Sequence, residues 1–393
     1  MLNTSSKRNI VFLGTSLPRE CGIATFTQDL MDQFVDLQGF NIPRIIAMNN
    51  NETYAYGDQV IREINQHQLA DYMDAADALN SSTTDLLVIQ HEFGIYGGES
   101  GEYLLPFIEK LTIPYIAIFH TVLTEPTPKQ QQIITQIAKS SLKVVTMAQS
   151  TVQDLIQIYD IDASKIAFIH HGVPYVATES RAKLKEQYGF EGRKIISTFG
   201  FLSPGKGIEY AIEAMRGVVK QHPEALYIIW GKTHPVVKLE TGEVYRQKLT
   251  QLVEQFELGR NVLFVDKLLT QEEVIQSLVM SDIYMTPYLG KDQAVSGTLA
   301  YGVGYGRVII STPYRYAEEM LAEGRGLLAG FRDSASLEAC ILQLLNNPSV
   351  VQEMEKRTQK LGSAMMWSEI AKTYASLFQE TLALSQFSGR SVI

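Results

Sequence analysis

Two glycine-containing segments in the second half of the chain have the residue types that bind an anion. The first is Gly200–Gly207, of sequence GFLSPGKG, and the second is Gln293–Tyr301, of sequence QAVSGTLAY. Each follows an apolar run typical of a strand and precedes a helical pattern, so backbone N–H groups at a helix start would point at a ligand. Lys206 is unfavourable at a helix start unless an anion also binds there. We therefore expect Lys206 and the N–H groups of Ser296–Thr298 to hold phosphate.

Polar and aromatic side chains follow two strand patterns of the first half. The segment Gln90–Gly98 has the sequence QHEFGIYGG and provides an imidazole, a carboxylate and a ring at His91, Glu92 and Tyr96. Carboxylates bind sugar hydroxyls and a ring packs on the apolar sugar face, so we expect a sugar-binding loop rather than a capped turn. His120 follows the next apolar run, where it could donate to a ligand hydroxyl, although a lone histidine is more often structural.

A glycine-containing turn, Gly14–Gly22, follows the first apolar run. Its Arg19 could meet an anion and Gly22 lets a ligand approach the backbone, but a plain strand–helix loop has the same composition. His170 and His171 end the last apolar run of the first half. With the two histidines above they do not predict a metal site, because the sequence has no i, i+4 histidine pair and no Cys/His spacing.

Apolar, β-branched runs alternate with helical patterns along the chain, which predicts parallel βαβ units and an α/β fold. The expected strands are 9–13, 43–48, 85–90, 115–119, 143–147 and 165–169, then 194–199, 225–230, 262–265, 283–287 and 307–311. The charged stretch 173–192 lacks a strand pattern and separates the two series. We therefore expect an N-terminal domain over 1–185, a second domain over 186–365 and a C-terminal helix within 366–393.

The composition excludes several classes of protein. The chain has 393 residues, 45% of them hydrophobic, and a net charge of −9, which argues against a nucleic-acid or membrane-surface binder. Its two cysteines cannot build a disulfide framework and fit a reducing cytoplasm. No apolar run is long enough for a signal peptide or a membrane span. We expect a cytoplasmic, two-domain protein.

These segments, in this order, resemble the family 4 retaining glycosyltransferases of the GT-B fold, the glycosyl transferases group 1. The resemblance runs from Asn9 to about Leu377. It rests on Pro18–Ala24, His120, Gly172–Val173, Ser203–Gly207, Val295–Gly306, Val308–Thr312, Glu318 and Trp367. It implies two Rossmann-like, doubly wound α/β domains facing across a cleft, with the acceptor on the N-terminal domain and the sugar nucleotide on the second. The final helix would cross back to the N-terminal domain.

The chain departs from the family pattern at three positions. The family usually has arginine where this chain has Phe201, and a pair of glutamates where it has Gln293 and Tyr301. A tyrosine offers one hydroxyl and no charge, so the usual ribose contact cannot be carried over. The loss of the arginine calls for a substitute cation. The candidates for this cation are Lys291, Arg307 and Arg19.

The resemblance implies retaining transfer of a hexosyl group, mannosyl or glucosyl, from a nucleotide-diphospho-sugar to a carbohydrate hydroxyl, without a cofactor or a metal. His120 and Lys206 would be catalytic. The donor would be held by Arg19, Gly22, Gln293, Ser296, Gly297, Thr298, Tyr301 and Glu318, and the acceptor by His91, Glu92 and Tyr96. Two other functions stay open. One is a retaining glycoside phosphorylase, which needs a phosphate site but no ribose contact, and the other is a non-catalytic glycan-binding protein.

Overall fold

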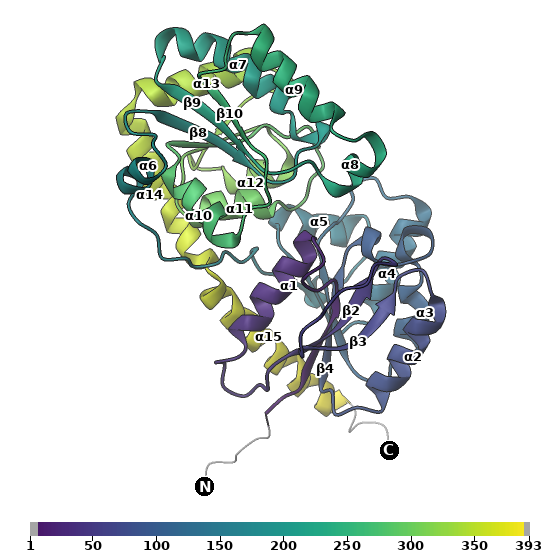
Figure 1. Cartoon of the computed structure of the whole chain (residues 1–393). Helices are drawn as coiled ribbons and strands as arrows, with labels where there is room; N and C mark the ends of the chain where they lie inside the picture. The colour runs from purple at the N-terminus through teal and green to yellow at the C-terminus, as the bar shows by residue number, and fades with distance from the viewer. Residues whose placement is uncertain (1–6, 389–393) are drawn as a thin grey trace. The chain divides into compact units, whose positions relative to one another are not determined.

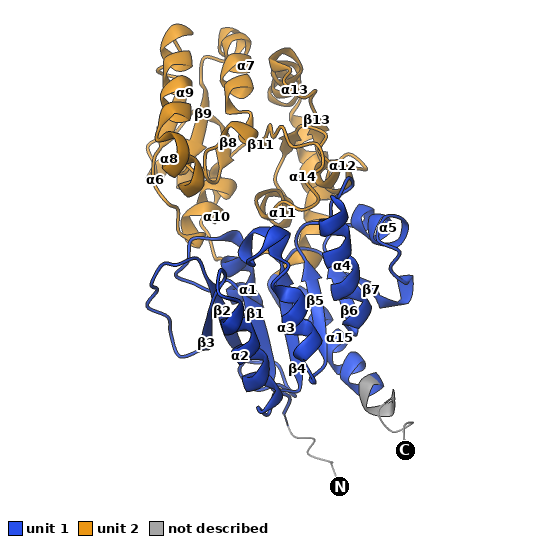
Figure 2. Ribbon diagram, turned by 90° about the vertical axis from the view of Figure 1, so that its right-hand side faces the viewer, with its two compact units in different colours: residues 1–172, 367–393 blue, residues 173–366 orange. Residues whose placement is uncertain are grey.

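Parallel strands alternate with helices along the computed structural model, which describes residues 7–388 (Figure 1). The chain forms two compact units, shown in blue and orange in Figure 2. Unit 1 comprises residues 1–172 and 367–393, and unit 2 comprises residues 173–366. Each unit has one parallel sheet with helices on both faces, the α/β architecture that the alternating pattern predicts.

The sheet of unit 1 has seven strands in the order β3-β2-β1-β4-β5-β6-β7. The strands are β1 Ile10–Gly14, β2 Arg44–Asn49, β3 Val60–Asn65, β4 Leu86–His91, β5 Tyr115–Phe119, β6 Lys143–Thr146 and β7 Ile166–Phe168. The helices are α1 Gly22–Gln33, α2 Leu69–Asn80, α3 Leu104–Lys110, α4 Pro128–Ser140, α5 Gln149–Gln157 and α15 Trp367–Ser388. The strand order reverses between β1 and β4, and ligands of such sheets bind beyond the carboxyl ends of the strands at this point.

The sheet of unit 2 has six strands in the order β10-β9-β8-β11-β12-β13. The strands are β8 Lys194–Phe199, β9 Ala225–Trp230, β10 Val262–Val265, β11 Ile283–Thr286, β12 Ile309–Ser311 and β13 Leu327–Leu328. The helices are α6 Arg181–Gln187, α7 Ile208–Gln221, α8 Pro235–Thr241, α9 Val244–Gln255, α10 Gln271–Met280, α11 Gly297–Gly304, α12 Arg315–Met320, α13 Ser334–Asn346 and α14 Pro348–Gly362. The strand order reverses between β8 and β11, so the same rule directs a ligand to the loops after these two strands.

The central strands are buried along their whole length, because helices cover both faces of each sheet. Every residue of β1, β4 and β9 is buried. Two strands were not expected, and both lie at sheet edges. Strand β3 has the sequence VIREIN, with an exposed arginine and an exposed glutamate, and β13 has only two residues. An edge strand faces solvent and therefore lacks the apolar run that identifies a central strand.

The division between the units falls after Gly172 and not near residue 185 as expected. Val173 pairs with Met366, and the Arg181 guanidinium reaches the Glu355 carboxylate at 2.6 Å, so residues 173–187 pack on unit 2. The strand pattern of the sequence could not locate this division, because residues 174–187 form no strand.

Helix α15 belongs to unit 1, where it packs beside α1 (Figure 1). Its first residue, Trp367, donates from Nε1 to the Asp29 carboxylate at 3.2 Å and packs on Gly172. A Cβ at Gly172 would lie 2.1 Å from the Trp367 ring, so only glycine admits the indole there. No helix among residues 7–388 is long and apolar enough to cross a membrane.

Candidate functional site

The loop after β8 has a helix start that is open to a ligand. Pro204–Lys206 forms a short 3-10 turn, and Gly207, with φ of +61°, begins α7 without a side-chain cap. The N-terminal N–H groups of α7 therefore lack the usual capping oxygen. Lys206 is half-buried, and its ammonium lies 3.7 Å from the centroid of the Tyr288 ring. This cation–π contact holds the charge in place beside the helix start.

The loop after β11 leads into the second predicted segment. Ser296 is buried and caps α11, since its hydroxyl accepts from Leu299 N at 3.3 Å. The Thr298 hydroxyl lies 2.8 Å from the Tyr288 hydroxyl and 3.1 Å from the Ser296 hydroxyl. The hydroxyls of Ser296, Thr298 and Tyr288 thus form one chain at the start of α11.

The fold brings these two segments together. Strands β8 and β11 are neighbours, so the loops after them meet at the same edge of the sheet. Leu289 N donates to Gly205 O at 2.9 Å, and a Cβ at Gly207 would lie only 2.1 Å from Pro287 O. We call Lys206, Gly207 and Ser296–Thr298 the phosphate cradle, with phosphate binding still a prediction. Tyr288, which contacts Lys206 and Thr298, was not among the predicted site residues. Its position directly after the apolar run 283–287 could have identified it, because loops after such strands bind ligands.

An apolar pocket of about 90 Å³ lies beside the cradle in unit 2. It is lined by Phe199, Gly200, Phe201, Trp230, Gly231, Lys232, Lys267, Leu268, Leu269 and Val274. The pocket residues lie at or after the ends of β8, β9 and β10 and in the first turn of α10. A smaller cavity at the ends of β8 and β9 is lined in part by Lys206. The side chain of Phe201, where the family pattern suggested arginine, forms part of the wall. The lining is mostly apolar and includes two lysines, Lys232 and Lys267.

Three further residues that were predicted to bind the sugar-nucleotide donor are close to the cradle in sequence but are not part of it. The Gln293 side-chain amide donates to Val295 O at 3.0 Å. The backbone carbonyl of Gln293 accepts from Tyr316 N at 3.2 Å, which joins this residue to α12. Glu318 is exposed in the first turn of α12. Tyr301 is half-buried within α11. A donor role for these three residues stays a prediction.

In unit 1, His120 is held by a buried glutamine. Its Nε2 lies 2.7 Å from Gln90 Oε1, and its backbone N–H donates to His91 O, because β4 and β5 are neighbours. Phe26 packs edge-on against the His120 ring, with centroids 4.8 Å apart. Burial lowers the pKa of His120 to about 3, assisted by the charges that His171 and His91 would carry. The ring is therefore neutral near pH 7. Gln90 begins the predicted sugar-binding segment, but its hydrogen bond to His120 was not predicted.

The structure contradicts the acceptor role predicted for His91 and Tyr96. His91 is fully buried among the rings of Phe93, Tyr96 and Phe119, and neither ring nitrogen has a hydrogen-bond partner among residues 7–388. Tyr96 is 3% exposed and donates its hydroxyl to Gln90 O at 2.8 Å. Both side chains point into the core because β4 continues through His91 and the following 3-10 turn folds back on it. Neither side chain can reach an acceptor.

Glu92 remains available as a site residue. Its carboxylate accepts from the Thr121 hydroxyl at 2.5 Å and from Phe93 N at 3.0 Å, and the residue is half-buried. Burial raises the pKa of this carboxyl group, while the two hydrogen bonds lower it. Glu92 thus lies beside the His120 loop with a carboxylate that takes up a proton more readily than usual.

Arg19 and Gly22 occupy the loop between β1 and α1. The Arg19 guanidinium donates to Met48 O at 2.8 Å and to Gln66 Oε1 at 3.4 Å, so it is directed to the ends of β2 and β3. Gly22 is exposed at the start of α1, where Cys21 provides no side-chain cap. Among residues 7–388, no group of three or more His, Cys, Asp or Glu side chains is arranged to hold a metal.

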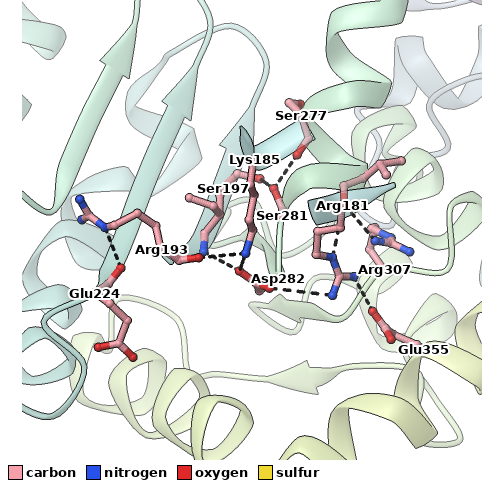
Figure 3. Close-up of polar contacts among 12 residues, drawn as sticks. Arg181, Lys185, Arg193, Ser197, Glu224, Ser277, Ser281, Asp282, Arg307 and Glu355 are labelled. Atoms are coloured by element: carbon pink, nitrogen blue, oxygen red, sulfur yellow. Dashed lines mark hydrogen bonds and ion pairs between the residues drawn. The ribbon is translucent and has the colours of Figure 1, made fainter. Parts of the chain in front are cut away.

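One predicted substitute cation lies at the wrong end of the sheet. Arg307 precedes β12, and its guanidinium donates to Tyr305 O at 2.9 Å. Figure 3 shows Arg307 beside Arg181 in a network of polar contacts. Asp282, which precedes β11, accepts from Lys185 at 2.6 Å in the same network. Residues that precede parallel strands lie at the amino edge of a sheet, opposite the loops that bind ligands. Arg181 anchors α6 through Glu355, whereas Arg307 donates to Tyr305 O and Val279 O, so neither guanidinium serves the phosphate cradle.

Comparisons with known proteins agree with this geometry. Residues 180–361, nearly all of unit 2, match the family Glycosyl transferases group 1. A putative glycosyltransferase of Bacillus subtilis, YtcC, is 28% identical over 105 residues, which are 27% of this chain. The match spans only about a quarter of that protein's length.

Solved structures of low sequence identity share the fold. Sucrose-phosphate synthase of Thermosynechococcus elongatus is 15% identical with a TM-score of 0.77, over 96% of this chain and all of that one. HepE of Anabaena in complex with UDP is 15% identical with a TM-score of 0.76, over 95% and 100%. A glycosyltransferase of Rickettsia africae is 15% identical with a TM-score of 0.75, over 95% and 99%. The two parallel sheets are thus those of the GT-B fold.

Proposed function

We propose that this chain belongs to the Glycosyl transferases group 1 family, which residues 180–361 match, and that it transfers a hexosyl group from a nucleotide-diphospho-sugar to a carbohydrate hydroxyl with retention of configuration. Unit 2 binds the donor and unit 1 the acceptor in this proposal. The Anabaena relative, whose structures contain UDP and UDP-glucose, makes a uridine nucleotide and a glucosyl group the first donor to test.

The observation that carries the proposal is the apolar pocket beside the phosphate cradle. A phosphorylase needs a phosphate site alone, whereas a sugar nucleotide also needs room for a flat base. The pocket walls of Phe201 and Trp230 suit such a ring, and Lys206 lines the adjoining small cavity. Phosphate and base sites on adjoining strand ends favour a nucleotide donor over a sugar 1-phosphate.

The residues of unit 2 stabilise the leaving group in the proposed mechanism. The glycosidic bond to the diphosphate breaks as the acceptor hydroxyl attacks from the same face, and the departing phosphate oxygen takes the acceptor proton. Lys206 and the N–H groups at the start of α11 bind the negative charge that develops on that oxygen. Preorganised donors are effective here because Tyr288 already fixes both the ammonium and the Thr298 hydroxyl. Gln293, Tyr301 and Glu318 are assigned to donor hydroxyls.

The residues of unit 1 orient the sugars. Neutral His120 contacts the transferring hexose through the ring nitrogen that Gln90 does not use. Glu92 binds an acceptor hydroxyl, and Gly22 leaves the start of α1 open to the donor phosphates. Lys291, exposed in the loop after β11, is the remaining candidate for the missing arginine, because Arg19 and Arg307 are held elsewhere.

A nucleotide-binding screen with a matched pair of lysine variants tests this function. We expect UDP, GDP or ADP, and not glucose 1-phosphate, to raise the melting temperature of the wild-type protein, since a ligand stabilises the state that binds it. Lys206→Ala is expected to abolish the shift and to reduce kcat/KM for release of the nucleoside diphosphate by about 10- to 100-fold. Lys220→Ala, an exposed lysine in the last turn of the same helix, is the control. Stabilisation by glucose 1-phosphate alone would refute the nucleotide donor.

A further inference from the structure

The burial of His91 and Tyr96 removes two of the three predicted acceptor contacts, yet aromatic and amide side chains, of the types that can bind sugars, gather elsewhere on unit 1. They lie in the loop between β2 and β3, residues 50–59, which we call the tyrosine loop because it carries Tyr54 and Tyr56. The loop follows the carboxyl end of β2, at the same edge of the sheet as His120 and Glu92. Strands β2 and β3 lie side by side at one border of unit 1 (Figure 2).

We propose that the tyrosine loop, together with Arg19, is the subsite that binds the carbohydrate acceptor. This inference rests on the proposed glycosyl transfer and identifies its second substrate as a neutral hexopyranose. It also explains why a loop of ten residues between two strands is so rich in amide and aromatic side chains. Such side chains are disproportionately placed on loops when they serve recognition.

The two tyrosine rings provide an apolar platform. Both side chains are half-buried, their ring centroids lie 5.6 Å apart, and the ring planes are tilted by 40°. Each hydroxyl is held by the loop or the strand before it. The Tyr54 hydroxyl lies 2.9 Å from both the Asn50 and the Glu52 side-chain oxygens, and the Tyr56 hydroxyl hydrogen-bonds the side chain of Asn49. The rings are therefore fixed before a ligand arrives, which lowers the entropic cost of binding.

The tyrosine hydroxyls stay protonated at neutral pH. Burial, and secondly the Glu63 carboxylate, raise the pKa of Tyr56 to about 12, and burial with Glu52 raises the pKa of Tyr54. Asn49 is 7% exposed and donates to Glu63 at 2.5 Å, which joins the loop to β3. A neutral phenol beside two carboxylates suits hydroxyls and the C–H face of a sugar ring, and it disfavours a phosphorylated acceptor.

Arg19, in the loop after β1, donates to residues at the ends of β2 and β3, the two strands that flank the tyrosine loop. Of its five N–H donors, two groups are used, on Met48 O and on Gln66 Oε1. Gln66 is itself buried, and its backbone N–H donates to Asn49 O at 2.8 Å. Arg19 thus extends the polar surface of the tyrosine loop toward Gly22, and its remaining donors suit sugar hydroxyls. This is a different role from the phosphate contact expected from the sequence.

Saturation-transfer NMR tests the subsite without any nucleotide. The probes are methyl α-D-glucopyranoside, methyl α-D-mannopyranoside and maltotriose. We expect transfer to the ring protons of at least one probe from the wild-type protein, and a decrease of about fivefold or more in Tyr54→Ala and in Tyr56→Ala, because the stacking surface is lost. Tyr54→Phe keeps the ring and is expected to keep most of the signal.

The control is Tyr175→Ala, which removes a tyrosine that is 79% exposed in unit 2. Among residues 7–388, Tyr54 makes its side-chain hydrogen bonds only within its own loop, so we expect Tyr54→Ala to leave the sheet intact. Unchanged transfer in both alanine variants overturns the proposal, and so does the absence of transfer to all three probes. The nucleotide screen with Lys206→Ala tests the proposed function separately from this subsite.

Discussion

At the residue scale, the hydrogen bond between His120 Nε2 and Gln90 Oε1 decides which ring nitrogen carries the proton. An amide oxygen only accepts, so the proton lies on Nε2 and Nδ1 is left to accept from a sugar hydroxyl. Gln90 fits because Gly14 lacks a side chain, since a Cβ there would lie 2.9 Å from Gln90 Cβ. A glutamine at this strand end thus determines the chemistry of the predicted catalytic histidine.

Substitution of Gln90 by glutamate tests this assignment. A carboxylate beside His120 would stabilise the imidazolium, so we expect Gln90→Glu to raise the pKa of His120 from about 3 toward its ordinary value. Two-dimensional NMR of the histidine ring, recorded against pH, measures the shift. Gln90→Leu removes the acceptor and leaves the pKa low, which makes it the control. An unchanged pKa in Gln90→Glu would show that Gln90 does not govern His120.

At the scale of elements, the phosphate cradle depends on the close approach of two loops. Gly207 permits it, because any side chain would meet Pro287 O. We expect Gly207→Ala to reduce nucleotide affinity by about tenfold or more, through displacement of the loop that carries Lys206. Gly242→Ala is the matched control, since Gly242 has a similar φ of +64° but open space around it. Calorimetric titration with UDP compares the two, and equal affinities would contradict the argument.

The sequence allowed most of these elements to be predicted, because central parallel strands are continuous apolar runs. The placement of the cradle also followed, since both of its segments come after such runs. The direction in which each side chain points could not be predicted from these runs. The sequence pattern predicts a loop at His91, but β4 extends through this residue and its ring lies in the core. For Arg307 the signal was present, because a residue that precedes a strand lies at the amino edge of the sheet.

At the scale of the whole molecule, one buried and two half-buried histidines, His91, His120 and His171, make the stability of unit 1 depend on pH. Burial lowers the pKa of His91 and His120 to about 3 and that of His171 to about 4, against 6.5 in the unfolded chain. Between these values and pH 6.5 the unfolded state binds more protons, so stability rises with pH in this range and is lost on acidification. The loss approaches about 1.4 kcal/mol per pH unit for each histidine that stays neutral.

His91→Phe isolates one of these contributions. The ring is fully buried without a hydrogen-bond partner, so phenylalanine fills the same aromatic surroundings and cannot titrate. From pH 7.5 to pH 5.0 the variant is expected to lose about 2 kcal/mol less unfolding free energy than the wild-type protein. Urea unfolding followed by circular dichroism at both values measures the difference. Equal losses in the two proteins would mean that His91 is protonated, or reached by water, in the folded state.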